Sequence, residues 1–214
     1  MQKKIKRELS LLYETLRDLL LIVAIALLIG GTILINSIML NDNYDLVNQI
    51  VRLNNYKYYP STVAVMKALE QMPSEHLQQI IDNKYELIVD NELLREQYDI
   101  HENTIPLSYE NIGGLTVFET KTVYIRSNIT SCGYAALHEM GHILDYCNNR
   151  VSSDKEFIEC YNKEKNTIRE YAKQSSLEYF ADLYALEIHP MRLFTYTTDD
   201  FRESINYMKS QEWW

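Results

Sequence analysis

The fold we expect is determined by the segment Leu137-His138-Glu139-Met140-Gly141-His142-Ile143-Leu144-Asp145. It holds two histidines four residues apart, with a glutamate directly after the first, and its flanks read as helix. Positions i and i+4 lie on one face of an α-helix, so both imidazoles can bind one metal ion at the roughly 2.0–2.1 Å that zinc requires. Glu139 lies beside such an ion, where it can take a proton from a water on the open coordination position. The segment therefore predicts one Zn2+ per chain, with His138 and His142 as ligands and Glu139 as general base.

The helix that carries this segment has recognisable ends. Thr130 or Ser131 can cap its start, and Asn148-Asn149 can end it. Gly141 costs about 1 kcal/mol relative to alanine inside a helix. We therefore expect close packing or a functional reason at that position.

A third ligand is expected, because catalytic zinc sites combine three protein ligands with one open position. Glu178, in the segment Leu177–Asp182, is the candidate. The alternative is that Ser175-Ser176-Leu177-Glu178 forms a capping box, in which Glu178 only satisfies the start of a helix. Asp182, one turn further on, is expected to accept a hydrogen bond from the free ring nitrogen of a ligating histidine. Asp145, one turn past the second histidine, is a rival third ligand or another carboxylate of that supporting kind.

The segment 19–40 reads LLLIVAIALLIGGTILINSIML and contains no charged side chain. As a helix it would be about 33 Å long, close to the roughly 30 Å hydrocarbon core of a bilayer. Basic residues precede it within 1–18, and the acidic segment 41–45 follows it. The positive-inside rule then predicts a cytoplasmic segment 1–18, a single-pass anchor in the cell membrane at 19–40, and a domain 41–214 outside the cytoplasm. The alternatives are a buried core helix, or a cleaved signal peptide that would make the protein secreted.

The rest of the chain predicts a mostly helical α+β domain. The formal net charge of −9 argues against nucleic acid as a partner. The hydrophobic periodicity predicts helices at 44–53, 62–72, 75–82, 154–171, 176–188 and 199–210, a short helix or turn at 91–98, and strands at 85–90, 115–119 and 122–126. The last two strands form a predicted hairpin. The first strand of this hairpin is either purely structural or an edge strand that pairs with an extended substrate.

The hairpin leading into the HExxH helix, together with the Glu-Tyr-Phe-Ala-Asp segment at 178–182, resembles the lethal-factor-like zinc metallopeptidases, which include the bacterial Pro-Pro endopeptidases. The resemblance covers residues 74–210. It includes Tyr171, seven positions before Glu178, which matches the family's active-site tyrosine. It implies a compact zincin-like metallopeptidase domain with a small sheet beside the HExxH helix. It also implies that Glu178 is the third zinc ligand and that Tyr171 donates a hydrogen bond to the developing oxyanion.

Together these features predict a membrane-anchored zinc metalloendopeptidase that cleaves protein or peptide substrates. Proline-containing sequences are one candidate substrate, bound as an extended strand, and the oligomeric state is open. The alternative is an inactive zincin-fold binding module at the cell surface. The presence of Glu139 argues against that alternative, because loss of the base is the easiest route to inactivity. The sequence leaves open whether Trp213-Trp214 packs on the domain or contacts the membrane interface.

Overall fold

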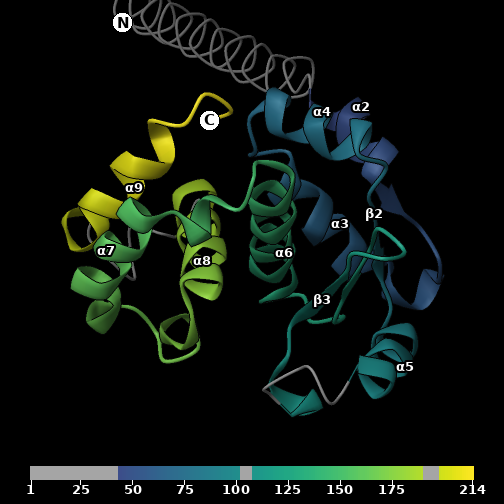
Figure 1. Cartoon of the computed structure of the whole chain (residues 1–214). Helices are drawn as coiled ribbons and strands as arrows, with labels where there is room; N and C mark the ends of the chain where they lie inside the picture. Colours follow the sequence, from purple (N-terminus) through teal and green to yellow (C-terminus); the bar gives the residue numbers. More distant parts are fainter. Residues whose placement is uncertain (1–42, 102–107, 190–197) are drawn as a thin grey trace, which may run out of the picture. The chain divides into compact units, whose positions relative to one another are not determined.

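The computed structural model describes residues 43–101, 108–189 and 198–214 (Figure 1). The predicted cytoplasmic segment 1–18 and the predicted membrane span 19–40 lie outside these ranges. Among the helices within them, none is both long enough and apolar enough to cross a membrane.

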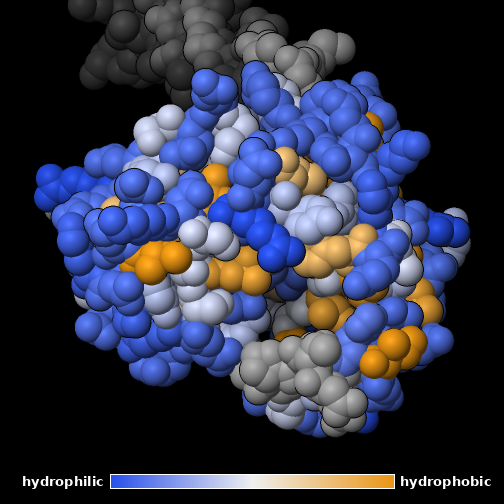
Figure 2. Space-filling view, in the orientation of Figure 1, coloured by the Kyte–Doolittle hydropathy of each residue, from blue (hydrophilic) through white to orange (hydrophobic). Residues whose placement is uncertain are grey.

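The described elements form a mostly helical α+β architecture, as the sequence predicts. The helices are α2 (Asn43–Ile50), α3 (Tyr59–Leu69), α4 (Ser74–Asp82), α5 (Asn91–His101), α6 (Cys132–Cys147), α7 (Lys155–Glu164), α8 (Ser176–Ile188) and α9 (Arg202–Lys209). The strands are β1 (Val51–Arg52), β2 (Glu86–Val89), β3 (Gly114–Val117) and β4 (Thr122–Ile125). Residues Asn43–Trp214 form one compact unit. The face of this unit in Figure 2 is mostly hydrophilic, with hydrophobic side chains in patches between polar ones.

The small sheet has the strand order β1-β2-β4-β3. Strands β1, β2 and β4 run parallel, while β3 runs antiparallel to β4 in the predicted hairpin. Leu87 of β2 is level with Val123 of β4, and both side chains are fully buried. The strand order leaves β3 at the edge of the described sheet, beside α6.

Helix α6 is at the centre of the domain, between α8 on one side and α3 with the sheet on the other (Figure 1). Because it has neighbours on both sides, its apolar residues are buried on more than one face. The fully buried ones include Leu137, Met140, Ile143 and Leu144. A buried helix between two layers holds its side chains rigidly, which suits the positioning of a site.

The predicted helix at 154–171 is wrong in its second half. Helix α7 ends at Glu164, and a 3-10 turn over Lys165–Thr167 follows. Ile168 then adopts an extended backbone, with φ of −90° and ψ of 167°, and is buried at 3% exposure. Because this side chain is buried, the backbone leaves the helical conformation here and leads toward the start of α8. Tyr171 therefore lies beyond the helix, immediately before a short 3-10 turn at Ala172–Gln174.

Three element boundaries also differ from those predicted. The predicted helix 44–53 ends at Ile50, because Val51–Arg52 pairs with β2 and becomes a strand. Helix α3 begins at Tyr59 rather than at residue 62, because the first turn of a helix tolerates a proline such as Pro60. The predicted short helix or turn at 91–98 is a helix, α5, which continues to His101.

The two C-terminal tryptophans pack on the domain. Trp213 and Trp214 lie with their ring centroids 5.3 and 5.5 Å from that of His76 on α4. Nδ1 of His76 is 2.9 Å from the hydroxyl of Tyr184 on α8. These contacts tie the end of the chain to α4 and α8.

Candidate active site

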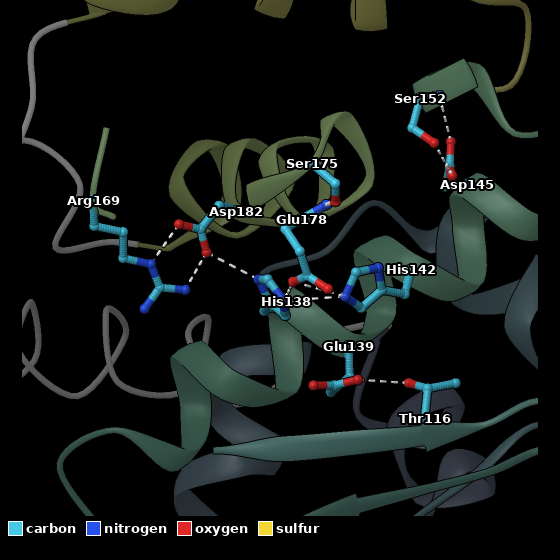
Figure 3. Close-up of polar contacts among 10 residues, drawn as sticks. All are labelled: Thr116, His138, Glu139, His142, Asp145, Ser152, Arg169, Ser175, Glu178 and Asp182. Carbon is cyan, nitrogen blue, oxygen red and sulfur yellow. Dashed lines mark hydrogen bonds and ion pairs between the residues drawn. The ribbon is translucent and has the colours of Figure 1, made fainter. Parts of the chain in front are cut away.

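Helix α6 presents both histidines of the HExxH motif on one face. Their Nε2 atoms lie 3.1 Å apart, and both residues are buried (Figure 3). The start and end of the helix agree with the sequence, with Ser131 at the N-cap position and Asn148 at the C-cap position. Ser131 makes no side-chain capping bond, so only its position was predicted correctly.

Gly141, between the two histidines, allows α6 and α8 to approach each other closely. A Cβ atom at this position would lie 2.9 Å from Cα of Ala181 and 3.2 Å from its carbonyl oxygen. A contact of that kind with backbone requires the helices to move apart. The glycine therefore has the packing role that the sequence suggested, and it brings the start of α8 within reach of the histidines.

Helix α8 supplies Glu178. Its Oε2 atom lies 3.1 Å from Nε2 of His138 and 3.5 Å from Nε2 of His142. Ser175 caps the helix, because its Oγ accepts a hydrogen bond from the backbone N–H of Glu178 at 3.1 Å. The capping-box alternative is therefore correct for Ser175, which caps the helix. It is not correct for Glu178, because the Glu178 carboxylate points toward the histidines (Figure 3).

The three side chains fit a zinc ion. One donor atom from each of His138, His142 and Glu178 lies within 4.8 Å of the other two. Ligands at about 2.0–2.1 Å around a tetrahedral ion are separated by about 3.3–3.4 Å. The observed separations of 3.1, 3.1 and 3.5 Å match that spacing. Two imidazoles and one carboxylate are also the donor set of a catalytic zinc site with an open position.

A buried carboxylate orients the first histidine. Oδ1 of Asp182 lies 2.9 Å from Nδ1 of His138, and the Asp182 side chain has no exposed surface. If Nδ1 donates to Asp182, Nε2 is unprotonated and faces Glu178. Arg169 donates to both oxygens of Asp182, which completes its hydrogen bonding.

Asp145 does not join this group, contrary to the expectation of a rival ligand or a second supporting carboxylate. Its Oδ1 accepts from the backbone N–H of Ser152 at 2.8 Å, and its Oδ2 accepts from the Ser152 hydroxyl at 2.6 Å. Both oxygens are therefore engaged in closing the turn after α6. We assign Asp145 a structural role.

Glu139 lies on the side of α6 that faces β3. The Thr116 hydroxyl donates to its Oε2 at 2.7 Å (Figure 3). A Cβ atom at Gly114 would lie 2.9 Å from Oε1 of Glu139, so a side chain at this position would displace the Glu139 carboxylate. The strand thus positions one carboxylate oxygen and leaves space around the other.

A cavity of about 500 Å³ opens beside these residues. Its wall includes His138, Glu139 and Tyr171, together with Gly113 and Gly114. The Tyr171 ring centroid lies 5.7 Å from that of His138. The volume is within the range of small-molecule and peptide side-chain sites. The structure therefore brings the predicted tyrosine to the same cavity as the predicted base.

The electrostatics of the site favour a positive charge at its centre. Burial lowers the pKa of His138, but hydrogen bonds to Asp182 and Glu178 outweigh burial and raise this pKa to about 9. Burial raises the pKa of Glu178, but hydrogen bonds from the two histidines outweigh it and hold the pKa well below its usual range. Both shifts arise because carboxylates surround the imidazoles. Such a site stabilises a proton or a metal cation.

Sequence reasoning missed two residues of this site. Thr116 lies two positions from Gly114 on β3 and so shares its face. Alternation along the predicted strand could have placed it beside the HExxH helix. No sequence pattern indicated Arg169, because the hydrophobic periodicity placed it inside a continuous helix.

The fold and the site define a mostly helical α+β domain built around an HExxH helix, with a glutamate from α8 facing the two histidines. The chain matches the family described as "Anthrax toxin lethal factor, N- and C-terminal domain" over residues 38–192. This match spans most of the chain, and the protein belongs to that family, as the motifs predicted.

A solved structure shares the fold. The Pro-Pro endopeptidase PPEP-2 from Paenibacillus alvei aligns with a TM-score of 0.60 and 19% sequence identity, over 77% of this chain and 98% of that chain. No curated protein sequence matches the chain.

Proposed function

We propose that the protein is a zinc-dependent metalloendopeptidase that cleaves protein or peptide substrates. The observation that carries this proposal is the triangle of His138 Nε2, His142 Nε2 and Glu178 Oε2, with the spacing that tetrahedral zinc requires. Glu139 and the cavity lie directly beside it. Membership of the lethal factor family and the fold shared with a protein named as an endopeptidase support the same conclusion.

The residues around the proposed ion have separate tasks in hydrolysis. Zinc bound here would lower the pKa of a water toward about 7 and polarise the scissile carbonyl. Glu139, oriented by Thr116, would take a proton from the attacking water and deliver it to the leaving amine. Burial and the nearby carboxylates of Glu178 and Glu139 raise the pKa of Tyr171 far above its usual range. Its hydroxyl therefore stays protonated and donates a hydrogen bond to the developing oxyanion.

The substrate in this proposal is an extended peptide paired with β3. This strand is at the edge of the described sheet, and it contacts Glu139 through Thr116. An added strand at such an edge gains main-chain hydrogen bonds. The name of the structurally similar Pro-Pro endopeptidase makes a proline-containing peptide the first candidate to test.

Metal analysis and peptide cleavage test the proposal together. We expect the purified chain to hold one zinc ion and to cleave members of a peptide library, with a chelator ending both. Glu139→Gln should keep zinc and lose cleavage, because an amide cannot act as the base. A wild-type chain without zinc, or near-normal cleavage by Glu139→Gln, would reject the proposal.

We further propose that residues 19–40 anchor the chain in the cell membrane with the peptidase domain outside the cytoplasm. The support comes from the sequence, namely the uncharged apolar run and the basic residues before it. Protease added to intact cells should then digest the domain and leave residues 1–18 protected. Digestion of 1–18 with protection of the domain would overturn this orientation.

A further inference from the structure

Arg169 makes two kinds of contact at the edge of the site. Its Nε donates to Oδ2 of Asp182 at 2.5 Å, and its Nη2 donates to Oδ1 of the same carboxylate. Its guanidinium also lies 5.0 Å from the ring centroid of Tyr134 and 5.5 Å from that of Tyr171. One side chain thus contacts both the carboxylate behind His138 and the tyrosine of the cavity wall.

The first contact fixes the plane of a buried carboxylate. Asp182 has no exposed surface, so a hydrogen bond to one histidine would leave its charge poorly compensated. The planar guanidinium matches a carboxylate with two parallel hydrogen bonds, which sets geometry as well as charge. Asp182 held in this way sets the ring plane of His138, and therefore the direction of the Nε2 atom that faces Glu178 and His142.

The second contact restrains the tyrosine. Tyr171 lies in an irregular segment, after an extended stretch and before a 3-10 turn, where backbone hydrogen bonds alone constrain a side chain weakly. A cation within about 6 Å of the face of an aromatic ring is attracted to it. Because the Arg169 head is already held by Asp182, it presents a fixed surface to the tyrosine ring.

We propose that Arg169 is a positioning residue that sets the orientation of the ligand His138, through Asp182, and of Tyr171, through ring contact. It is not a catalytic residue in this scheme, because it acts through these two groups. The inference rests on the proposed zinc peptidase function and adds a link between the metal ligands and the oxyanion donor. It accounts for an arginine that no motif explains.

The experiment compares Arg169→Lys with wild type by chelator-competition zinc titration and by steady-state cleavage of a peptide substrate. Lysine keeps the charge but is a single point donor that cannot span both Asp182 oxygens. Loss of an outer partner of a metal ligand typically weakens metal binding about 10–100-fold. We expect a loss of that size in zinc affinity. At saturating zinc we also expect a fall of about tenfold or more in kcat with little change in KM, because misplacement of a catalytic group acts on the transition state.

Arg95→Lys is the matched control. Arg95 also pairs with an aspartate, Asp99, with 3.0 Å between Nε and Oδ1, and also lies over a tyrosine ring, that of Tyr109 at 4.6 Å. This pair is exposed, and Arg95 is not part of the cavity wall. Zinc affinity and kcat should stay at wild-type values in this variant.

A double-mutant cycle with Asp182→Asn tests the route of the effect. If Arg169 acts on zinc affinity through Asp182, Arg169→Lys should change that affinity little in the Asp182→Asn background. Additive losses would overturn the inference. Circular dichroism checks folding, and if Arg169→Lys does not fold, Arg169→Gln is titrated in its place.

The outcomes separate the two proposals. A wild-type chain that neither binds zinc nor cleaves peptides overturns the proposed function and this inference with it. A wild-type chain that does both, with Arg169→Lys (or Arg169→Gln in its place) equal to it in zinc affinity and kcat, overturns the inference alone.

Discussion

Three carboxylates at or near α6 differ in role because they differ in partners. Glu178 faces the two Nε2 atoms, whereas both oxygens of Asp182 are engaged by His138 and Arg169. Both oxygens of Asp145 go to Ser152. Only Glu178 has its carboxylate aimed at the place where a cation would be shared with the histidines.

Glu178→Ala should therefore weaken zinc binding by more than the about 10–100-fold that loss of an outer partner costs. Asp145→Ala should instead lower the free energy of unfolding, by about 1–3 kcal/mol, because Ser152 loses its acceptor. Its zinc affinity should stay near wild type. A zinc titration and a urea unfolding curve on both variants give the comparison. Glu187→Ala, on α8 like Glu178, is a further control. Equal zinc affinity in Glu178→Ala and wild type would show that Glu178 only belongs to the helix start.

Tyr171→Phe should fold, bind one zinc ion and lose most of its turnover. Phenylalanine keeps the ring that contacts Arg169 and deletes the hydroxyl. Removal of one oxyanion donor typically lowers kcat about 10²–10³-fold, with KM little changed when the contact forms only in the transition state. Steady-state kinetics at saturating zinc measure the effect.

Tyr179→Phe is the control for that substitution. The Tyr179 hydroxyl contacts Glu164 and Ser204, at 3.3 and 3.2 Å, rather than residues of the site. Its loss should lower the free energy of unfolding by about 1 kcal/mol and leave kcat near wild type. Wild-type turnover in Tyr171→Phe would mean that the family's tyrosine role does not extend to this chain.

Helices α6 and α8 could be predicted from the sequence because their patterns are internal to each helix. The spacing of His138 and His142 and the Ser175 cap depend on residues one turn apart. Strand β1 could not be predicted in this way, since Val51–Arg52 is a strand only through its pairing with β2. The prediction of a helix after α7 was wrong for the same reason, because burial of Ile168 by distant elements overrode the helical periodicity.

Gly141→Ala tests the close approach of α6 and α8. Alanine favours a helix by about 1 kcal/mol over glycine, but its Cβ would lie 2.9 Å from Cα of Ala181. Overpacking of this kind typically costs about 1–3 kcal/mol. We expect a lower melting temperature. Because separation of the helices moves Glu178 away from the histidines, we also expect weaker zinc binding.

Gly133→Ala distinguishes packing from ligand geometry. A Cβ atom there would lie 3.0 Å from Cβ of Ala68 on α3, at the opposite side of α6 from α8. Zinc affinity should stay near wild type in this variant, whatever the change in its unfolding free energy. If Gly141→Ala binds zinc as tightly as Gly133→Ala does, the glycine serves packing alone.

The site is assembled from four segments: β3, α6, the irregular stretch around Arg169, and α8. The candidate ligands were predictable as residue types, because HExxH and a later glutamate form a recognisable set. Their mutual distances were not, since these depend on how α8 packs at Gly141. Arg169 shows the limit most clearly, because its partner Asp182 is known only once the chain is folded.

The packing of His76 against Trp213 and Trp214 predicts how the free energy of unfolding depends on pH. His76 is 1% exposed and lies against both terminal tryptophans. Burial lowers its pKa from the ordinary value of about 6.5. The unfolded chain then binds more protons than the folded chain between the two pKa values, so the unfolding free energy falls as the pH drops below about 6.5.

His76→Gln removes this titration and keeps a polar partner for the Tyr184 hydroxyl. Urea unfolding of both proteins should show a difference in unfolding free energy, wild type minus variant, that is constant above about pH 7. That difference should shrink below about pH 6.5, by at most about 1.4 kcal/mol per pH unit. Taking the difference cancels the titration of the other histidines and carboxylates, which the two proteins share. Parallel curves from pH 7.5 to 5 would mean that His76 accommodates its proton when folded, and that the tryptophan cluster does not hold it neutral.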